Sequence, residues 1–400
     1  MKSITRYILL LIIPALMIGG LTTSCEKDDE GIKITGTPVV KYIRSTNPEQ
    51  ADSLIVGAFM GSLIAVVGEH LGHTREMWFN DQKATLNPAY VTDQSIIVNV
   101  PSTVPSEVNN KIRFVFSDDT ELLYDFSVNV PGPEIATVKS EYVPDGGTMR
   151  LEGDFFFEPK VIFPGDLEGT VTAFDKTWLE VEVPAGSTTG PVVVQTTFGK
   201  ATSSFMFRDD RNILLDFDEK IHETWTAQIA GEGDFAEVTP VSGKFAYFKN
   251  DDFGAWQWVN EMTLQYWAPR GRGNIPVATG NINDLVLKFE ANVPIEWKEV
   301  RMEIFFAPFA EDHGRDLPST AMARWRPWVN GPFKTDGWIT VAIPLSEFKY
   351  NKDDPEDDEI GSAAIEDLSS LTNVTMMMFG PAEGTNPVFV AVDNVRVVPR

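Results

Sequence analysis

The sequence predicts an all-β protein made of two smaller β-sandwiches followed by a larger one. Segments 179–183 and 300–304 alternate strictly between apolar and polar residues, and 285–290 does so from Leu287 onward. Such alternation places apolar side chains on one face of a strand. Gly and Pro punctuate the chain at short intervals, and no long helical period separates them. With 43% hydrophobic residues, including 26 Phe and 10 Trp, the chain can bury a large core.

Residues 1–24 have the pattern of a signal peptide. Lys2 and Arg6 supply positive charge, and residues 8–21 form an apolar run that is too short to span a bilayer. Residues 22–24 are small, as a signal peptidase requires. The sequence therefore predicts export and cleavage near residue 24.

The single cysteine, Cys25, begins the predicted mature chain and is followed by the acidic stretch 26–30. The arrangement resembles a bacterial lipobox, although Leu21 lies one place further from the cysteine than usual. The Lys-Asp-Asp after Cys25 resembles a surface-export tag of Gram-negative lipoproteins. We expect lipidation of Cys25, a tether over 25–36, and a lipid-anchored location at the cell surface on the outer membrane. An ordinary secretory peptide is the alternative.

Two punctuated segments divide the body of the chain. The first is the Pro-Gly stretch 131–133, and the second is the charged stretch 208–211. They predict domains at 37–130, 131–208 and 209–400, and we expect the last to fold on its own.

The first two domains have features of a diverged repeat. Gly68 and Gly153 each follow a predicted buried strand and precede an acidic residue, and Val-Pro pairs follow at 100–101 and 183–184. Each domain has the size of a small immunoglobulin-like sandwich. The second also resembles the IPT/TIG domain.

A net charge of −25 excludes some partner classes. It repels nucleic acid and anionic lipid, so we expect no nucleic-acid partner and contact with the membrane through the lipid anchor alone. A neutral partner suits the chain better. His70 and His73 could suggest a metal site, but Gly68 and Gly72 argue against a helix there, and we expect a solvated loop and no metal.

Tryptophan gathers in the third domain. Pyranose rings have an apolar face that binds flat aromatic surfaces, with polar side chains around the rim. After residue 210 the chain has these tryptophans: Trp225, Trp256, Trp258, Trp267, Trp297, Trp325, Trp328 and Trp338.

Local sequence separates displayed rings from core rings. Pro327 interrupts a strand between Trp325 and Trp328, which predicts a loop displaying both rings beside Arg324. A second displayed pair is predicted before a turn-forming segment: Tyr266 and Trp267. Core positions are predicted for two further rings: Trp225 and Trp338. The pattern leaves three rings undecided between core and binding site: Trp256 and Trp258, which are predicted to share one face of a strand, and Trp297.

The third domain also resembles a known module. The segments that carry the resemblance are 214–218, 254–258, 287–290, 325–333, 337–345 and 391–397. Together they are similar to the C-terminal domain of surface glycan-binding lipoproteins of starch-utilisation-type uptake systems. The resemblance implies non-catalytic capture of a polysaccharide or oligosaccharide, such as the β-glucan xyloglucan, and delivery to an outer-membrane glycan transporter complex. This chain has two spacer domains, whereas the xyloglucan binders have three.

The resemblance implies no cofactor apart from a structural calcium ion. Sugar-binding sandwiches often hold calcium near their termini, and Asp216, Asp218 and Asp393 are oxygen ligands of the right kind.

Two other function classes remain open from the sequence. A glycoside hydrolase needs two carboxylates across a cleft. Candidates by residue type are Glu290, Glu299, Glu303, Asp336 and Glu347. Strand alternation predicts that Glu290 and Glu303 face solvent. A protein-binding adhesin would explain the immunoglobulin-like repeat but not the tryptophans.

Overall fold

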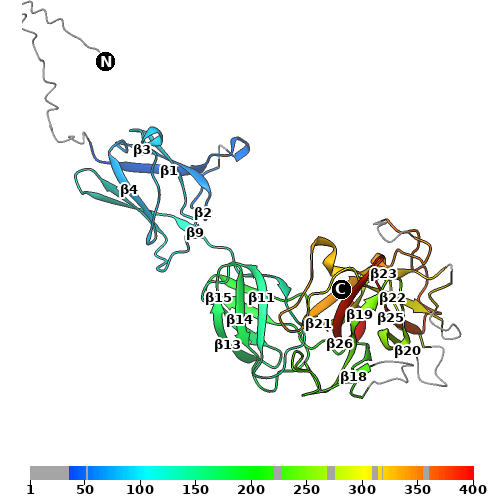
Figure 1. Cartoon of the computed structure of the whole chain (residues 1–400). Helices are drawn as coiled ribbons and strands as arrows, with labels where there is room; N and C mark the ends of the chain where they lie inside the picture. Colours follow the sequence, from blue (N-terminus) through cyan, green and yellow to red (C-terminus); the bar gives the residue numbers. More distant parts are fainter. Residues whose placement is uncertain are drawn as a thin grey trace, which may run out of the picture. The chain divides into compact units, whose positions relative to one another are not determined.

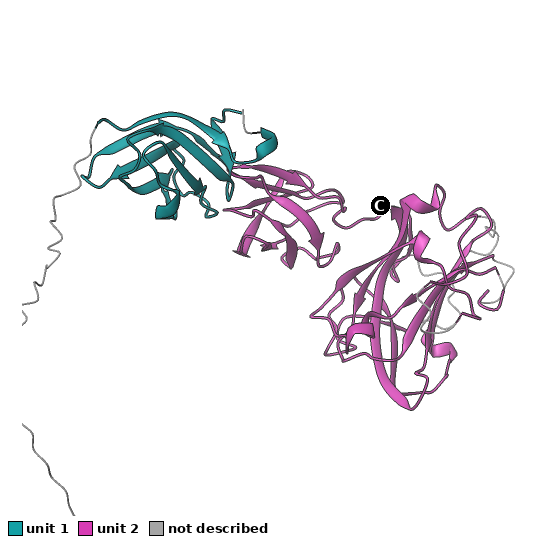
Figure 2. Cartoon of the chain, turned by 90° about the horizontal axis from the view of Figure 1, so that it is seen from above, with its two compact units in different colours: residues 1–129 teal, residues 130–400 magenta. Residues whose placement is uncertain are grey.

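The computed structural model describes residues 36–50, 53–219, 228–267, 275–308, 314–317, 319–354 and 360–400. These residues are almost entirely β-strands and loops, with short 3₁₀ turns, which confirms the predicted all-β class (Figure 1). The chain divides into two compact units, residues 1–129 and 130–400 (Figure 2). Within the described ranges no helix is long and apolar enough to cross a membrane. The predicted signal peptide and Cys25 lie outside the described residues.

The first unit contains a small sandwich. Its strands are β1 (Val39–Ser45), β2 (Gly57–Phe59), β3 (Leu63–Glu69), β4 (Thr74–Phe79), β5 (Gln82–Lys83), β6 (Ser95–Asn99), β7 (Lys111–Phe116), β8 (Glu121–Asp125) and β9 (Ser127–Asn129). One sheet has the order β1-β3-β6, the other has the order β5-β4-β7-β8, and β2 pairs in parallel with β9. Alternate residues fill the core, including Ile64 and Val66 of β3 and Phe114 and Phe116 of β7.

The segment predicted as a solvated loop around His70 is a tight turn between β3 and β4. Its backbone closes where the Thr74 amide donates to the Leu71 carbonyl at 3.1 Å. His70 Nδ1 lies 3.9 Å from the carboxylate of Asp93. Among the side chains that the structure describes, no group of three or more His, Cys, Asp or Glu could hold a metal ion.

The two smaller sandwiches share a glycine at a bulged strand pair. Gly68 of β3 and Gly153 of β11 (Thr148–Asp154) each lie opposite a strand whose register shifts by a bulge. A Cβ atom at either glycine would collide with a carbonyl oxygen of the partner strand, from Val39 or Glu134 respectively. Close backbone approach therefore explains why both repeats have glycine there.

The second unit begins with a seven-stranded sandwich. Its other strands are β10 (Glu134–Val138), β12 (Lys160–Phe163), β13 (Leu167–Phe174), β14 (Trp178–Glu182), β15 (Val193–Thr196) and β16 (Gly199–Thr202). Hydrogen bonds connect the strands in the order β10-β11-β14-β13-β12-β15-β16. Met149, Val161, Val181 and Val194 lie in its buried core.

The larger sandwich follows. Its strands are β17 (Ile213–Leu215), β18 (Gln228–Ala230), β19 (Phe245–Gly254), β20 (Thr263–Trp267), β21 (Leu285–Asn292), β22 (Arg301–Ala307), β23 (Met322–Trp325), β24 (Ile339–Pro344), β25 (Asn373–Phe379) and β26 (Thr385–Pro399). One sheet has the order β18-β19-β26-β21-β24, with β17 paired to β26, and the other has the order β20-β25-β22-β23. Leu287 and Phe289 of the first sheet share a core with Met302 and Ile304 of the second.

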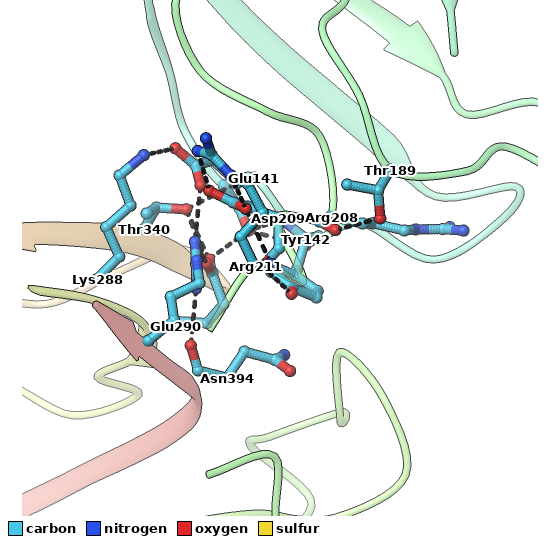
Figure 3. Close-up of polar contacts among 12 residues, drawn as sticks. Glu141, Tyr142, Thr189, Arg208, Asp209, Arg211, Lys288, Glu290, Thr340 and Asn394 are labelled. Carbon is cyan, nitrogen blue, oxygen red and sulfur yellow. Dashed lines mark hydrogen bonds and ion pairs between the residues drawn. The ribbon is translucent and has the colours of Figure 1, made fainter. Parts of the chain in front are cut away.

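The two sandwiches of the second unit meet at a buried polar joint beside β21 (Figure 3). Glu141 of the smaller sandwich bonds to Lys288 at 2.5 Å and to Arg396 of β26 at 2.7 Å. Arg396 also bonds to Glu290 at 3.0 Å. All four side chains are buried, so the charges satisfy one another where water is excluded.

The charged segment 208–211 forms part of this joint. Asp209 is completely buried, and its two carboxylate oxygens each accept a bond of 2.8 Å from Arg211. The hydroxyl of Tyr142 donates to the backbone carbonyl of Asp209 at 2.5 Å. Burial raises the pKa of Tyr142, which keeps this donor protonated. The segment between the sandwiches is therefore held by buried contacts.

Candidate functional site

One face of the sheet β20-β25-β22-β23 combines polar side chains with burial. In these strands Leu264, Ile304 and Met376 point into the main core, so their neighbours in sequence point away from it. We call these neighbours the outer face: Thr263, Gln265, Arg301, Glu303, Phe305, Met322, Arg324, Thr375, Met377 and Phe379. Apart from Arg324, all of them are buried.

Two polar atoms beside this face have no hydrogen-bond partner in the described part of the chain. They are Oγ1 of Thr375 and Oδ1 of Asn373, which are both buried. A buried polar group without a partner costs about 1–3 kcal/mol. Both atoms lie below the solvent-accessible surface of this face.

A single carboxylate organises the cations of the outer face. Glu303 is completely buried at the centre of β22. Its Oε1 accepts from Nε of Arg301 at 3.1 Å and its Oε2 from Nε of Arg315 at 2.8 Å. The Nε of Arg324, on the neighbouring strand, lies 4.0 Å from the same carboxylate. Burial lowers the pKa of Arg324, and the charge of Glu303 opposes that shift.

Each of these arginines also lies over an aromatic ring. Arg301 lies 5.1 Å from the ring centroid of Phe379 and 5.9 Å from that of Trp256. Arg315 lies 4.4 Å from the centroid of Phe379. Arg324 lies 4.5 Å from that of Tyr350. The carboxylate thus holds guanidinium groups in positions where they fix several rings.

Trp256 and Trp258 are the displayed tryptophans of the described residues, with 59% and 50% of their surface exposed. They do not share a strand face, because β19 ends at Gly254 and Trp256 adopts a positive φ of 54°. The amide of Trp256 donates to the carbonyl of Pro381 at 3.0 Å. This bond fastens the exposed turn to the chain just beyond β25, at the end of the outer face.

The prediction that Trp325 and Trp328 form a displayed pair is wrong. Pro327 does end β23 and begins a 3₁₀ turn, but both rings are partly buried against the main core. The Trp325 ring meets Trp297 edge-on at 5.0 Å, and Trp328 Nε1 donates to the carbonyl of Val300 at 2.6 Å. Trp297 is completely buried, so it is a core residue.

The remaining predicted aromatics have different outcomes. The backbone of Tyr266 and Trp267 continues β20, but their side chains lie outside the described residues, as does Trp225. Trp338 is partly buried against a small core cluster, where it meets Phe245 edge-on at 5.7 Å.

The expectation that Glu290 and Glu303 face solvent is also wrong. Both are completely buried, because β21 and β22 are covered on both faces. Glu290 belongs to the joint, and Glu303 is bonded to arginines. Both carboxylates are therefore engaged by arginines inside the fold.

The aspartates predicted as calcium ligands do not form a metal-binding group. Asp393 is buried, and its carboxylate pairs with the amide of Asn394 at 2.7 Å and the hydroxyl of Ser242 at 3.2 Å. Burial raises its pKa well above the ordinary value.

Sequence patterns did not reveal Arg301 and Phe379 of the outer face, nor Arg315 and Tyr350, which contact it. The available signal was the alternation in β22, where Arg301 and Glu303 occupy the positions between core residues. Alternation alone suggested solvent, since nothing in the sequence indicated that this side of the strand is also covered.

Comparisons with known proteins agree with this architecture. The family model for the surface glycan-binding protein B xyloglucan binding domain matches residues 207–399. An IPT/TIG domain-containing protein from Bacteroides ovatus is 33% identical over 208 residues, which cover 49% of this chain and 38% of that protein. The matched part is thus well under half of this relative's length.

Two solved structures share the fold. The surface glycan-binding protein PbSGBP-B from Prevotella bryantii has a TM-score of 0.72 and 23% identity, covering 92% of this chain and 100% of that one. SGBP-B from a complex xyloglucan utilization locus in Bacteroides uniformis has a TM-score of 0.51 and 19% identity, covering 91% and 100%. These findings confirm the predicted resemblance: residues 207–399 match the family model of the surface glycan-binding protein B xyloglucan binding domain.

Proposed function

We propose that this protein captures a neutral polysaccharide, xyloglucan or a related β-glucan, without cleaving it. The site is centred on the exposed rings of Trp256 and Trp258, which the buried outer face of the sheet β20-β25-β22-β23 supports. The observation that carries the proposal is the juxtaposition of two exposed indole rings with a buried polar sheet face. The family of residues 207–399 supports the ligand class.

The chemistry of the site suits a sugar chain. Indole rings stack on the apolar faces of pyranose rings, while the partly exposed guanidinium group of Arg315 donates to their hydroxyls. Because Glu303 already orients Arg301 and Arg315 in the free protein, these side chains lose little conformational entropy when a ligand binds.

The location and the partner complete the proposal. Lipid on Cys25 would anchor the chain to the outer membrane with its domains outside the cell, where a large polysaccharide is accessible. Captured glycan would then pass to an outer-membrane transporter complex. The family of the C-terminal domain supports a cell-surface role.

Calorimetric titration with a xyloglucan-derived oligosaccharide tests the site. We expect the double substitution Trp256→Ala/Trp258→Ala to weaken binding at least about thirtyfold, because truncating an aromatic anchor costs about 2 kcal/mol or more. Phe174→Ala, another exposed ring in the second unit, is the matched control and should bind normally. Unchanged affinity in the double variant would remove these rings from the site.

Two further measurements separate the competing functions. Reducing sugar released from incubated polysaccharide would indicate a hydrolase. Binding to proteins but to none of a panel of polysaccharides would indicate an adhesin.

A further inference from the structure

A groove lies at the joint between the two sandwiches of the second unit. It consists of two adjoining hollows of about 270 and 450 Å³. Both are lined by Lys139 and Arg150 of the smaller sandwich and by Asp336 of the larger one. This joint groove is separate from the outer face, because Asp336 and Trp338 lead into β24, which belongs to the other sheet of the large sandwich.

The first hollow has an aromatic wall in a fixed orientation. Trp338 lines it, together with Tyr142, Pro144 and Pro240. Nε1 of Trp338 donates to the carbonyl of Thr239 at 2.7 Å, which holds the indole in place. An indole beside proline rings provides the apolar surface on which a pyranose ring can lie.

The charges around the groove are mixed in sign. Lys139 lies 3.6 Å from the carboxylate of Asp336. Arg150 lies over the Trp178 ring at 4.4 Å and pairs with Glu180 at 3.0 Å. The groove therefore offers both donors and acceptors without an excess of positive charge. This chemistry suits the hydroxyls of a neutral sugar better than a phosphate or a nucleic acid.

The joint holds the two walls of the groove in place. Thr340 donates from its amide to the carbonyl of Lys139 at 2.9 Å, and its hydroxyl accepts from the amide of Glu141 at 2.7 Å. The buried bonds between Glu141, Lys288 and Arg396 stabilise the same contact (Figure 3). A groove formed by rigidly joined domains is preorganised for a ligand, and domain junctions are common ligand sites.

We propose that the joint groove is a second glycan subsite, which binds a short stretch of a neutral β-glucan against Trp338. This inference rests on the proposed function, because it assigns the same ligand class to a second place. A polysaccharide long enough to engage both sites would be retained more strongly than a short oligosaccharide.

The test uses full-length proteins that carry substitutions in the second unit. Each protein is titrated with a xyloglucan-derived oligosaccharide. The double substitution Trp256→Ala/Trp258→Ala should weaken binding but leave a measurable affinity, which we call the residual affinity. Adding Lys139→Ala and Asp336→Ala should reduce that residual affinity at least tenfold. Both added side chains lie at the surface, so the fold should survive, and circular dichroism checks this. Lys160→Ala/Glu168→Ala removes a comparable surface pair of the same unit and is the matched control.

The outcomes distinguish the two proposals. If the unmodified chain binds and the tryptophan double variant does not, the second subsite is disproved while the proposed function stands. Residual binding that is insensitive to the groove substitutions also overturns the subsite. If the unmodified chain binds no glycan, both proposals fail.

Discussion

Arg396 and Glu290 form an ion pair of 3.0 Å in which neither side chain reaches solvent. Glu141, which lies in the preceding sandwich, completes the pair by accepting a second bond from the same guanidinium. Burial raises the pKa of Glu290, while the charge of Arg396 opposes that shift. The charge balance of the large sandwich therefore depends on a residue of the smaller one.

The first prediction concerns that dependence. Glu141→Ala removes the buried carboxylate that pairs with both Lys288 and Arg396. Breaking a buried pair in this way costs about 3–5 kcal/mol. We expect chemical denaturation to show a loss of that order. Glu168→Ala, at an exposed pair, should change the unfolding free energy little. Equal losses of unfolding free energy in the two variants would show that the buried contacts of Glu141 stabilise the protein no more than an exposed ion pair does.

Truncation gives a second prediction on the joint. The charged segment 208–211 suggested a domain that folds alone from residue 211, but Asp209 is completely buried at the joint and bonded to Arg211. We expect a fragment 130–400 to melt at a clearly higher temperature than a fragment 211–400. Calorimetry of both fragments measures this, and equal melting temperatures would support independent folding.

The third prediction follows from Asp393. Its pKa is raised by burial, so the folded protein holds this proton more tightly than the unfolded chain. The associated stability is fully present below the ordinary pKa of 3.8 and is lost as the pH rises through the raised folded value. Asp393→Asn should therefore gain stability relative to the parent as the pH rises from 4 to 7. Denaturation curves across that range test the slope.

Calcium would change that result. If a calcium ion neutralised Asp393, chelator would lower the melting temperature of the parent, and Asp393→Asn would lower it as well. We expect chelator to have no effect, because Asp216, Asp218 and Asp393 do not form a group that could hold a metal.

The sequence predicted the class of fold and the family better than the site. Strand alternation and the Gly-Pro punctuation are local signals, and they located segments such as 179–183 and 300–304 in β14 and β22. Whether an aromatic ring is exposed depends on residues that are distant from it in the sequence. Pro327 after Trp325 suggested a loop that displays the ring, but the ring packs against Trp297 and Phe289. The sequence around Trp256 suggested a strand, but a backbone hydrogen bond to Pro381 holds this residue in a turn.

The fourth prediction concerns the anchor. Cys25→Ala removes the thiol that lipid would modify, so the protein should appear in the soluble fraction or remain unprocessed. In the parent, added protease should digest the body of the chain on intact cells. Protection in intact cells together with digestion after lysis would contradict surface exposure.

The last prediction compares two tryptophans, one expected to stabilise the fold and one expected to bind glycan. Trp325 packs edge-on against Phe289 at 5.3 Å and Trp297 at 5.0 Å, so Trp325→Ala opens a cavity in the core. The cost should be about 3–5 kcal/mol of unfolding free energy. Trp256→Ala removes an exposed ring and should lower glycan affinity while leaving the melting temperature nearly unchanged. Denaturation and calorimetric titration of both variants distinguish these roles. A folded Trp325→Ala protein of parental stability that has lost its affinity would return that ring to the binding site.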